Sequence, residues 1–548
     1  MEWMRQLLSG NEAVAWAAKD AGVRLGVGYP GTPSTEILET FGALDGPAQW
    51  APNEKVALEV ALGVAYANAR ALVTTKHVGL NVAADPLFTA AYTGAPGGLV
   101  IVVADDPGMA SSQNEQDSRR YAVAAGLPML EPADSQQAYA MTREALELAE
   151  RWSLPVLLRL TTRVSHSKSV VQRAAVVSAP APGFTRDIAG RVMIPGNARP
   201  AHRRLREKLD QVAAWVETPG CGTRLWNAPH AAVEAGADGD QAMAKTPDVR
   251  RPLGIVADSV AVLHAREAAP QADVLQVRMV HPLPIETIRR FAASVERCVV
   301  VEEGDPVMVE ACRAAGIAVE GKAERYRFGE LNVGRVRRIL AGEDRPESRP
   351  PAGKPPQLCT GCPHRIVFNL LRDLDCIVSG DIGCYTLGAL PPFDAMDTCV
   401  CMGASIGVGL GLRHALPPAE ARRVVSVIGD STFVHSGLTG LVEMVYNPPP
   451  SGHVVVILDN QTTAMTGLQE HPGTGRNLRH EPAPQLIIEE VCRSVGVPQV
   501  VVIDPIRERE RLPATLKQAL DEGGLWVLVV RRTCLLEKTR QQKAEGSA

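Results

Sequence analysis

Short runs of apolar, mostly β-branched residues alternate with stretches rich in Ala, Leu and Glu along most of the chain. In the first part of the sequence, strands are predicted at 23–28, 71–76, 99–104 and 155–161, and helices at 11–21 and 55–69. Strands that alternate with helices in this way are typical of parallel sheets covered by helices. The pattern therefore predicts an α/β fold.

Breaks in this pattern divide the chain, whose 548 residues are too many for one hydrophobic core. Residues 178–200 are rich in Pro, Gly and Arg, and the polar stretch 203–245 is predicted to hold a helix and loops without a strand. The Pro-rich stretch 344–356 is predicted to be an extended linker. The expected parts are an α/β domain at 1–180, a linker and helical segment at 181–250, a smaller α/β domain at 251–343, the linker, and a third α/β domain at 357–548 with a short polar tail. In that third domain, strands are predicted at 376–379, 423–429, 453–459, 500–503 and 525–530.

Charge and composition narrow the class of protein. The formal net charge is −4 and residues of both signs are interspersed, which excludes the clustered basic face of a nucleic-acid-binding protein. No apolar run approaches the length of a membrane-spanning helix, and the chain does not start like a secretory signal, so a cytoplasmic protein is expected. Cysteines in that compartment stay reduced, and their odd number, 11, also argues against a disulfide framework. Eight of them follow residue 350, which calls for a chemical explanation.

The strongest chemical pattern lies at two successive strand ends in the third domain. The predicted strand 423–429 delivers Gly429, Asp430 and Ser431, and the next strand delivers Asn460 and Thr462. The carboxyl ends of parallel strands are where such folds bind ligands, and Asp and Asn oxygens suit Mg²⁺. Hydroxyls and helix N-termini suit a diphosphate. The residues that could bind the diphosphate or the metal are Gly429, Asp430, Ser431, Thr432, Ser436, Asn460 and Thr462, with Mg²⁺ held by Asp430, Asn460 and Thr462. Either turn alone could be an ordinary strand end.

The spacing of these two turns resembles the thiamine-diphosphate fingerprint, a GDG or GDS turn followed by an Asn about thirty residues later. The Gly-rich helix start that contains Cys401, Met402 and Gly403 resembles the segment that lines the cofactor in such domains. Thiamine chemistry also needs a carboxylate at the pyrimidine N1′, in a different α/β domain from the diphosphate site. Glu54 lies at a strand-to-helix junction of the first domain and is the candidate. A surface glutamate that opens an amphipathic helix is the alternative.

The cysteines of the third domain form a second candidate site. Cys359 and Cys362 make a CxxC pair, and Cys384 follows in GDIGC. A lone CxxC is open to zinc, redox and iron–sulfur interpretations. Three thiolates do not close a site, and Cys534, just past the last strand, is the candidate for the fourth.

Longer motifs carry a family resemblance over almost the whole chain. GVGYPGTPSTEI, NEKVALEVALG, KHVGLNVAADPL, VVADDPGMASSQNEQDSR, CTGCPHR, SGDIGCYTLG and GDSTFVHSGLTGLVEMVYN resemble the alpha subunit of indolepyruvate:ferredoxin oxidoreductase, in the 2-oxoacid:ferredoxin oxidoreductase family. The resemblance implies two thiamine-diphosphate-binding doubly wound parallel-sheet domains plus a transketolase-C-terminal-like α/β domain. It also implies Glu54 as the activating carboxylate, Thr32 near the thiazolium and substrate, and a proximal 4Fe–4S cluster on Cys359, Cys362, Cys384 and Cys534. His77 and the run 111–117 are weaker candidates for lining the substrate pocket.

The resemblance implies the oxidative decarboxylation of a 2-oxoacid, expected to be an aryl pyruvate such as indolepyruvate or phenylpyruvate, to the acyl-CoA. Electrons would pass through the cluster to ferredoxin or another acceptor, and a beta subunit would complete a hetero-oligomer. The chain ends in LLEKTRQQKAEGSA without the two CxxCxxCxxxCP runs that usually follow in this family, so the two distal clusters are expected to be absent from this polypeptide. A non-oxidative thiamine-dependent decarboxylase or carboligase, and a non-catalytic cofactor-binding scaffold, are the rival hypotheses.

Overall fold

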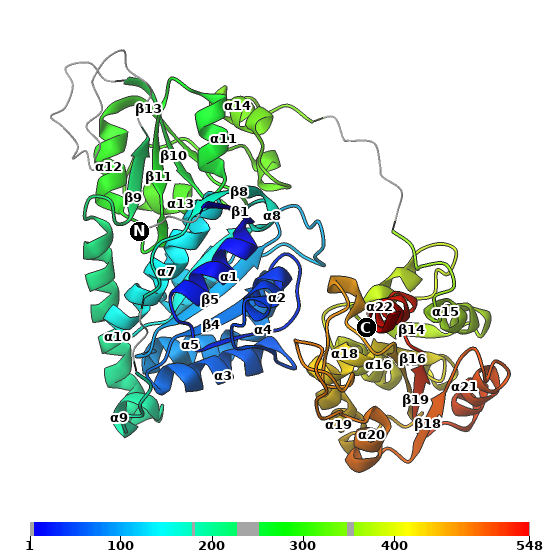
Figure 1. Ribbon diagram of the computed structural model, residues 1–548. Helices are drawn as coiled ribbons and strands as arrows, with labels where there is room; N and C mark the ends of the chain where they lie inside the picture. The colour runs from blue at the N-terminus through cyan, green and yellow to red at the C-terminus, as the bar shows by residue number, and fades with distance from the viewer. Residues whose placement is uncertain (1–4, 178–180, 227–250, 348–355, 547–548) are drawn as a thin grey trace. The chain divides into compact units, whose positions relative to one another are not determined.

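The computed structural model describes residues 5–177, 181–226, 251–347 and 356–546. The chain forms two compact units, Met1–Ser348 and Arg349–Ala548 (Figure 1). The boundary falls inside the Pro-rich stretch 344–356, of which residues 348–355 lie outside the described residues. Each predicted strand is present, with ends that differ by at most two residues from the prediction.

A seven-stranded sheet forms the centre of the first unit, in the order β12-β6-β7-β5-β4-β2-β3. Its neighbouring strands are parallel except for β12, which runs antiparallel to β6. Central strands such as β5 are continuously apolar because helices cover both of their faces. The strands are β2 (Leu25–Gly28), β3 (Ala48–Trp50), β4 (Ala71–Lys76), β5 (Leu99–Asp105), β6 (Met129–Leu130), β7 (Val156–Thr161) and β12 (Met279–His281).

Helices α1, α2 and α7 cover one face of this sheet, and α3 and α5 cover the other (Figure 1). Side-chain caps mark where they begin: Ser9 and Glu12 form a capping box on α1, and Asn53 and Asp134 cap α3 and α7. The helices of this part are α1 (Gly10–Asp20), α2 (Thr35–Ala43), α3 (Glu54–Tyr66), α4 (His77–Val82), α5 (Ala84–Thr93), α6 (Arg119–Ala125), α7 (Ser135–Trp152) and α8 (Thr162–His166). Strands β1 (Arg5–Ser9) and β8 (Lys168–Gln172) form a separate antiparallel pair.

The segment 181–250 differs from its prediction. Its strand β9 (Thr223–Trp226) pairs antiparallel with β11, so the expectation of no strand at 203–245 was wrong; residues 227–250 lie outside the described residues. The long helix α10 (Pro195–Val216) begins inside the predicted break 178–200, after the short α9 (Ile188–Arg191). Pro195 occupies the first turn of α10, where a missing N–H costs nothing, whereas Pro200 lies inside the helix, so the Pro-rich composition did not mark a loop.

A four-stranded sheet in the order β13-β10-β11-β9 belongs to the same unit. Its strands, apart from β9, are β10 (Arg251–Asp258), β11 (Asp273–Val277) and β13 (Val295–Val301), and its helices are α11 (Ala261–Ala268), α12 (Ile285–Ala293), α13 (Val307–Ala314), α14 (Val333–Leu340) and the 3₁₀ turn η1 (Glu324–Arg327).

The second unit contains a six-stranded, fully parallel sheet in the order β15-β14-β16-β17-β19-β18. Its strands are β14 (Ile377–Gly380), β15 (Thr398–Cys399), β16 (Val424–Gly429), β17 (His453–Asp459), β18 (Gln499–Ile503) and β19 (Leu525–Arg531). Its helices are α15 (His364–Asp373), α16 (Ala404–Ala415), α17 (Pro418–Ala421), α18 (Asp430–Thr432), α19 (Leu438–Tyr446), α20 (Ile488–Val495), α21 (Arg511–Glu522) and α22 (Leu535–Gly546), with 3₁₀ turns η2 (Cys384–Ala389) and η4 (Ala464–Thr466) and a π-helical turn η3 (Phe433–Gly437). The expected polar tail is thus the helix α22, which Arg540 ties to the carbonyl of Leu468 and to Glu470.

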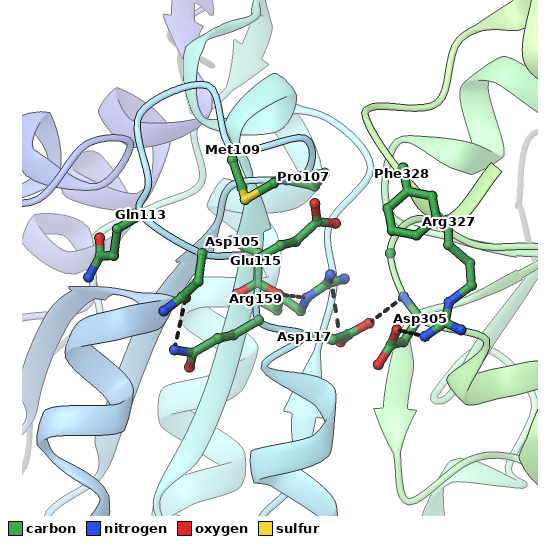
Figure 2. Close-up of a pocket in the computed structure, with 13 residues that line it drawn as sticks. Asp105, Pro107, Met109, Gln113, Glu115, Asp117, Arg159, Asp305, Arg327 and Phe328 are labelled. Atoms are coloured by element: carbon green, nitrogen blue, oxygen red, sulfur yellow. Dashed lines mark hydrogen bonds and ion pairs between the residues drawn. The ribbon is translucent and has the colours of Figure 1, made fainter. Parts of the chain in front are cut away.

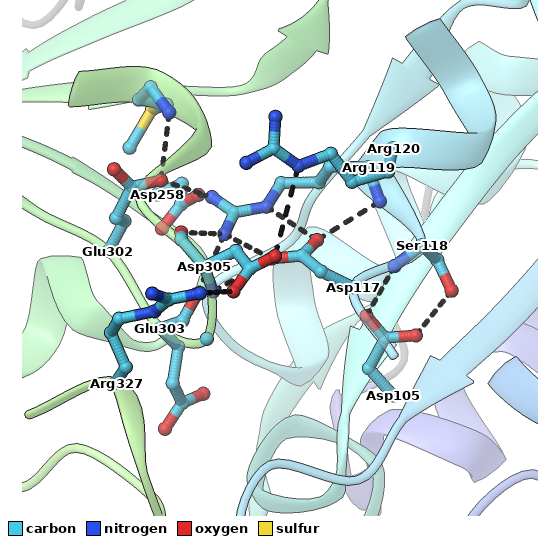
Figure 3. Close-up of polar contacts among 12 residues, drawn as sticks. Asp105, Asp117, Ser118, Arg119, Arg120, Asp258, Glu302, Glu303, Asp305 and Arg327 are labelled. Carbon is cyan, nitrogen blue, oxygen red and sulfur yellow. Dashed lines mark hydrogen bonds and ion pairs between the residues drawn. The ribbon is translucent and has the colours of Figure 1, made fainter. Parts of the chain in front are cut away.

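Buried charges join the two sheets of the first unit (Figure 3). Arg119, at the start of α6, is fully buried and reaches Asp117 on its own side and Asp258 and Glu302 on the other, with N–O distances of 2.6–2.8 Å. A second buried arginine, Arg159 on β7, binds Asp105 and Glu131 at 2.6 and 2.8 Å. Because these charges are removed from water, each depends on its partners for compensation.

The acids of this network outnumber its bases, and their pKa values reflect it. Burial raises the pKa of Glu131 to about 8 and that of Glu303 to about 7. Each of these two carboxyls has one oxygen without a hydrogen-bond partner in the described structure. Asp117 instead contacts both arginines, which hold its pKa well below the ordinary value against the effect of burial.

Replacing Arg119 should destabilise the first unit strongly. Arg119→Met keeps most of the volume but leaves Asp117, Asp258 and Glu302 buried without their cation, so we expect a loss of about 3–5 kcal/mol in the free energy of unfolding. Denaturant titration measures it. The neighbouring Arg120→Met is the matched control, because Arg120 is exposed and binds Glu310 at the surface, where a pair contributes less than about 1 kcal/mol. Equal effects of the two variants would contradict the structural role of Arg119.

Candidate functional site

The carboxyl end of β16 carries the residues predicted for the diphosphate site. Gly429 ends the strand, Asp430 opens the short helix α18, and the π-helical turn η3 with Ser436 follows before α19. Such turns are rare and concentrate at functional sites. Asp430 and Asn460 are both largely buried, at 3% and 9% exposed, and lie at the ends of the adjacent strands β16 and β17.

Asp430 is held by a dense set of donors. The N–H groups of Ser431 and Gln461 donate to its two oxygens at 2.9 and 2.7 Å. His471 Nε2 lies 3.2 Å from Asp430 Oδ2. Burial alone would raise the pKa of Asp430, but His471 and these N–H groups outweigh it and hold the pKa below its ordinary value. His471 was not predicted; it lies in a segment without periodicity, and only the fold brings it to the strand end.

The remaining residues of the predicted diphosphate cradle lie around this point. Ser431 Oγ accepts a hydrogen bond from Thr463 at 3.0 Å, and Thr432 Oγ1 donates to the carbonyl of Ile382 at 3.0 Å. The N–H of Thr462 donates to Asn460 Oδ1 at 3.2 Å. The missing side chain of Gly429 makes room for the ring of Tyr385, since a Cβ there would lie 2.6 Å from that ring. The structure thus gives this glycine a packing reason that the sequence did not suggest.

The Gly-rich start of α16 is anchored by Asp381, which sequence analysis passed over. This buried carboxylate accepts hydrogen bonds from the N–H groups of Gly403 and Ser405 at 2.9 and 3.0 Å. Gly403 has a φ of +86° and packs against Ser436, where a Cβ would lie 2.5 Å from the serine Cβ. Of the predicted lining residues, Gly403 and Ser436 are therefore in contact, whereas Met402 is half-buried and Cys401 is exposed.

The four predicted cluster cysteines line a single cavity. Its walls include Cys359, Cys362, Cys384, Cys534, His364 and Asn460, together with Leu535 and Leu536 from the start of α22. Backbone pairing places the distant Cys534 here, because its N–H donates to the carbonyl of Asn460 at 3.0 Å. Among the described residues, no three His, Cys, Asp or Glu side chains are arranged to hold a single metal ion. The four cysteines thus surround a cavity next to Asn460 and are not arranged around the position of a single metal ion.

His364, which follows the CxxC pair and received no role from the sequence, lines this cavity. It is buried, and its ring lies edge-on to Tyr385 with centroids 6.2 Å apart. Burial lowers its pKa to about 4, so the imidazole is neutral at physiological pH. Its Nδ1 has no hydrogen-bond partner in the described structure, which leaves one polar atom available to a ligand.

In the first unit, Glu54 is the first residue of α3 and only 6% exposed. Its carboxyl group packs over Gly79 of α4, where a Cβ would lie 2.4 Å from Oε1 and 2.2 Å from Thr75 Oγ1. The alternative of a solvated surface glutamate was therefore wrong, because the first turn of α3 faces the carboxyl end of β4. Asp430 and Glu54 belong to different units.

The loop after β5 covers this sheet edge. Ser111 Oγ donates to the carbonyl of Thr32 at 3.4 Å, which brings the loop to the half-buried Thr32. The buried His77 contacts the carbonyl of Asn114 through Nε2 at 3.1 Å. Residues 113–117 line a cavity of about 400 Å³ whose far wall contains Asp305, Arg327 and Phe328 (Figure 2). The run 111–117, for which a solvated loop was the alternative, thus partly encloses a pocket.

Comparisons with known proteins agree with these features. A model of the thiamine-diphosphate-binding domain of pyruvate flavodoxin/ferredoxin oxidoreductases matches residues 16–184, and one of the C-terminal TPP-binding domain of thiamine pyrophosphate enzymes matches residues 381–530. The chain is 38% identical over its full length to indolepyruvate oxidoreductase subunit IorA of Archaeoglobus fulgidus, covering 89% of that protein. It is also 38% identical to IorA of Methanothermobacter thermautotrophicus, with 96% of this chain and 87% of that protein aligned.

A solved structure resembles part of the fold. The 2-oxoglutarate:ferredoxin oxidoreductase from Magnetococcus marinus, with 2-oxoglutarate, coenzyme A and succinyl-CoA bound, aligns with a TM-score of 0.50 at 16% identity, over 62% of this chain and 65% of that one. At this identity the likeness supports the fold alone. No described helix has the length and apolar content needed to cross a membrane.

Two thiamine-diphosphate-binding domain models match the two units that hold Glu54 and Asp430, and the full-length relatives are subunits of an oxidoreductase. The family predicted from the motifs is confirmed. This chain belongs to the indolepyruvate oxidoreductase subunit IorA family, within the 2-oxoacid:ferredoxin oxidoreductases.

Proposed function

We propose that this chain is the catalytic subunit of an enzyme that oxidatively decarboxylates an aryl 2-oxoacid such as indolepyruvate or phenylpyruvate to its acyl-CoA. The observation that carries the proposal is the position of Asn460. Asn460 lies at the end of the strand next to that of Asp430. Its backbone carbonyl accepts a hydrogen bond from the N–H of Cys534, which lines the cysteine cavity. A cofactor site and an electron-transfer site would therefore share one residue. The relatives' names supply the substrate class.

The residues at the end of β16 fit a Mg²⁺-diphosphate. Asp430, Asn460 and Thr462 offer the hard oxygen ligands that Mg²⁺ prefers. Ser431, Thr432 and Ser436, with Gly429 and Gly403 in the backbone, surround the same point and would face the phosphates. Met402 and Cys401 would line the cofactor next to Gly403. Thiamine diphosphate, when bound, supplies a carbon nucleophile for the keto carbon and accepts the electron pair released with CO₂.

Glu54 would bind the pyrimidine of the same cofactor and hold the proton at N1′. Its burial favours this role because a carboxylate in a low-dielectric site makes a stronger hydrogen bond to a ring nitrogen than one in water. Thr32 would lie near the reacting carbon.

Cys359, Cys362, Cys384 and Cys534 would hold one 4Fe–4S cluster. A cluster binds one thiolate at each of its irons, and it occupies a volume, which agrees with four thiols around a cavity. Electrons would leave through it to ferredoxin or another carrier, and coenzyme A would take the acyl group. A beta subunit would complete the hetero-oligomer, and residues 251–343 would correspond to the transketolase-C-like domain. The cysteine cavity argues against a non-oxidative lyase, and the buried Glu54 against a scaffold.

Glu54→Gln should remove most of the activity without loss of the cofactor. The amide cannot hold the proton at N1′, so we expect kcat for indolepyruvate oxidation to fall by about 100-fold or more. The affinity for thiamine diphosphate, measured by calorimetry, should change only a few-fold. Glu59→Gln, at an exposed position on the same helix, is the control. Near-normal turnover by Glu54→Gln would refute the assignment.

Asp430→Ala should weaken the binding of Mg²⁺ with thiamine diphosphate. Loss of one charged ligand should raise the dissociation constant by about 10- to 100-fold, measured by calorimetry at fixed Mg²⁺. Asp375→Asn, an exposed carboxylate of the same unit, should leave the constant unchanged. An unchanged constant in Asp430→Ala would place the metal elsewhere.

Cys534→Ser should lower the iron content of anaerobically purified enzyme. The wild type should carry about four irons and four sulfides per chain, with visible absorbance that 2-oxoacid and coenzyme A bleach. The variant should lose most of both signals, whereas Cys221→Ser, in the other unit, should keep them. Full iron content in Cys534→Ser would mean that the fourth ligand is another residue.

A further inference from the structure

Lys76 is a buried lysine at the carboxyl end of β4, in the part of the sheet where α/β folds bind ligands. Its side chain is 9% exposed, and its ammonium group donates to the carbonyl of Ser111 at 3.0 Å and lies 3.4 Å from the Ser111 hydroxyl. Both partners are neutral. A buried ammonium group whose direct hydrogen-bond partners are neutral has lost much of its hydration, and only a nearby negative charge can compensate for that loss.

The other buried cations of this sheet have their charge compensated. Arg119 binds Asp117, Asp258 and Glu302 within 2.8 Å, and Arg159 binds Asp105 at 2.6 Å. The acid that acts on Lys76 is Asp106, and its oxygens accept from the N–H of Ser111 at 2.8 Å and from the hydroxyls of Ser112 and Thr162 at 2.5 and 3.0 Å. Burial lowers the pKa of Lys76, and Asp106 only partly opposes this. Lys76 can therefore bind a further anion.

The surroundings of Lys76 place it at the proposed active site. Thr75 precedes it, and Gly79, three residues later, packs against both the hydroxyl of Thr75 and the carboxyl group of Glu54. The aliphatic part of Lys76 lies along Gly31, whose added Cβ would be 3.3 Å from the lysine Cβ. Its partner Ser111 also contacts the carbonyl of Thr32. Lys76 is thus three residues from Gly79, which packs against Glu54, and its ammonium group contacts the residue that bonds to Thr32.

We propose that Lys76 binds the carboxylate of the 2-oxoacid substrate. The inference rests on the proposed function and adds the residue that selects 2-oxoacids over aldehydes and ketones with the same side chain. An ammonium group suits this task because it donates to either carboxylate oxygen. The carboxylate leaves as CO₂, so the contact stabilises bound substrate more than later states, and its loss should raise KM more than it lowers kcat.

The test uses Lys76→Met in the complete holoenzyme with its partner subunit, Mg²⁺ and thiamine diphosphate. The probe is indole-3-lactate, which keeps the carboxylate but has no keto carbon to react, and the comparison is its neutral amide. Calorimetry should show binding of the lactate weakened about 10- to 100-fold, with binding of the amide and of thiamine diphosphate unchanged. Lys76→Arg should recover part of the lactate affinity.

The steady-state arm measures indolepyruvate turnover, in which KM should rise by a similar factor while kcat falls less. Lys168→Met, which removes an exposed lysine of the same unit, is the matched control and should change neither quantity. Unchanged lactate binding in Lys76→Met overturns the proposal, and so does an equal loss for lactate and amide, which would show that Lys76 only ties the Ser111 loop in place. Absence of substrate-dependent CO₂ release from the wild type would instead refute the proposed function, while the lactate measurement still judges Lys76.

Discussion

The register of three parallel strands in the second unit is the constraint on which its chemistry depends. Gly429 on β16 pairs opposite Leu458 on β17, and Asp459 on β17 pairs opposite Arg531 on β19. The chain therefore leaves all three strands at the same level. Asp430 and Asn460 follow their strands directly and Cys534 is the third residue after β19, and the backbone hydrogen bond between Asn460 and Cys534 continues the pairing beyond the sheet. A shift of one residue in either strand pair would turn these side chains to the other face.

In the first unit too, the polar residues of the proposed site gather at the carboxyl ends of parallel strands. The carboxyl end of β4 holds Lys76. The start of α3 places the carboxyl group of Glu54 over Gly79 of α4, the helix that follows β4. Acid and base lie on short segments that buried strands and capped helices hold in place, rather than on long loops. The loop after β5 is the exception, and Asp106 organises it by accepting hydrogen bonds from its own backbone and hydroxyls. Strands, capped helices and the hydrogen bonds of Asp106 therefore hold the polar groups of this sheet edge in place.

The buried charged side chains of the first unit hold its two sheets together. Arg119 and Arg159 connect acids from β5, from β10 and from the turns after β6 and β13. Strand β12, from the smaller sheet's part of the chain, pairs with β6 of the larger sheet. The smaller sheet is therefore an integral part of the first unit. The far wall of the 400 Å³ cavity, with Arg327 and Phe328, comes from that same part of the chain. The shape of the cavity thus depends on how the two parts of the first unit pack together.

Local pattern was sufficient for the longer strands of the two large sheets and for helices α1 and α3, and it singled out the Asp430 and Asn460 turns and the CxxC pair, because apolar runs and strand-end motifs are local in the chain. Glu54 was chosen on the family resemblance, since a glutamate that opens an amphipathic helix is by itself more typical of a protein surface. The Pro-rich start of α10 and the short edge strand β9 escaped it, since a proline in a first turn and a four-residue edge strand leave little local pattern. His471, Asp381 and Lys76 also escaped it. Their importance comes from burial and from partners 22 to 41 residues away, such as Asp430, Gly403 and Ser111. Sequence by itself determined which residue types could do the chemistry, and only tertiary packing decided which of them lose water and meet, because desolvation and contact depend on residues that are far apart in the chain.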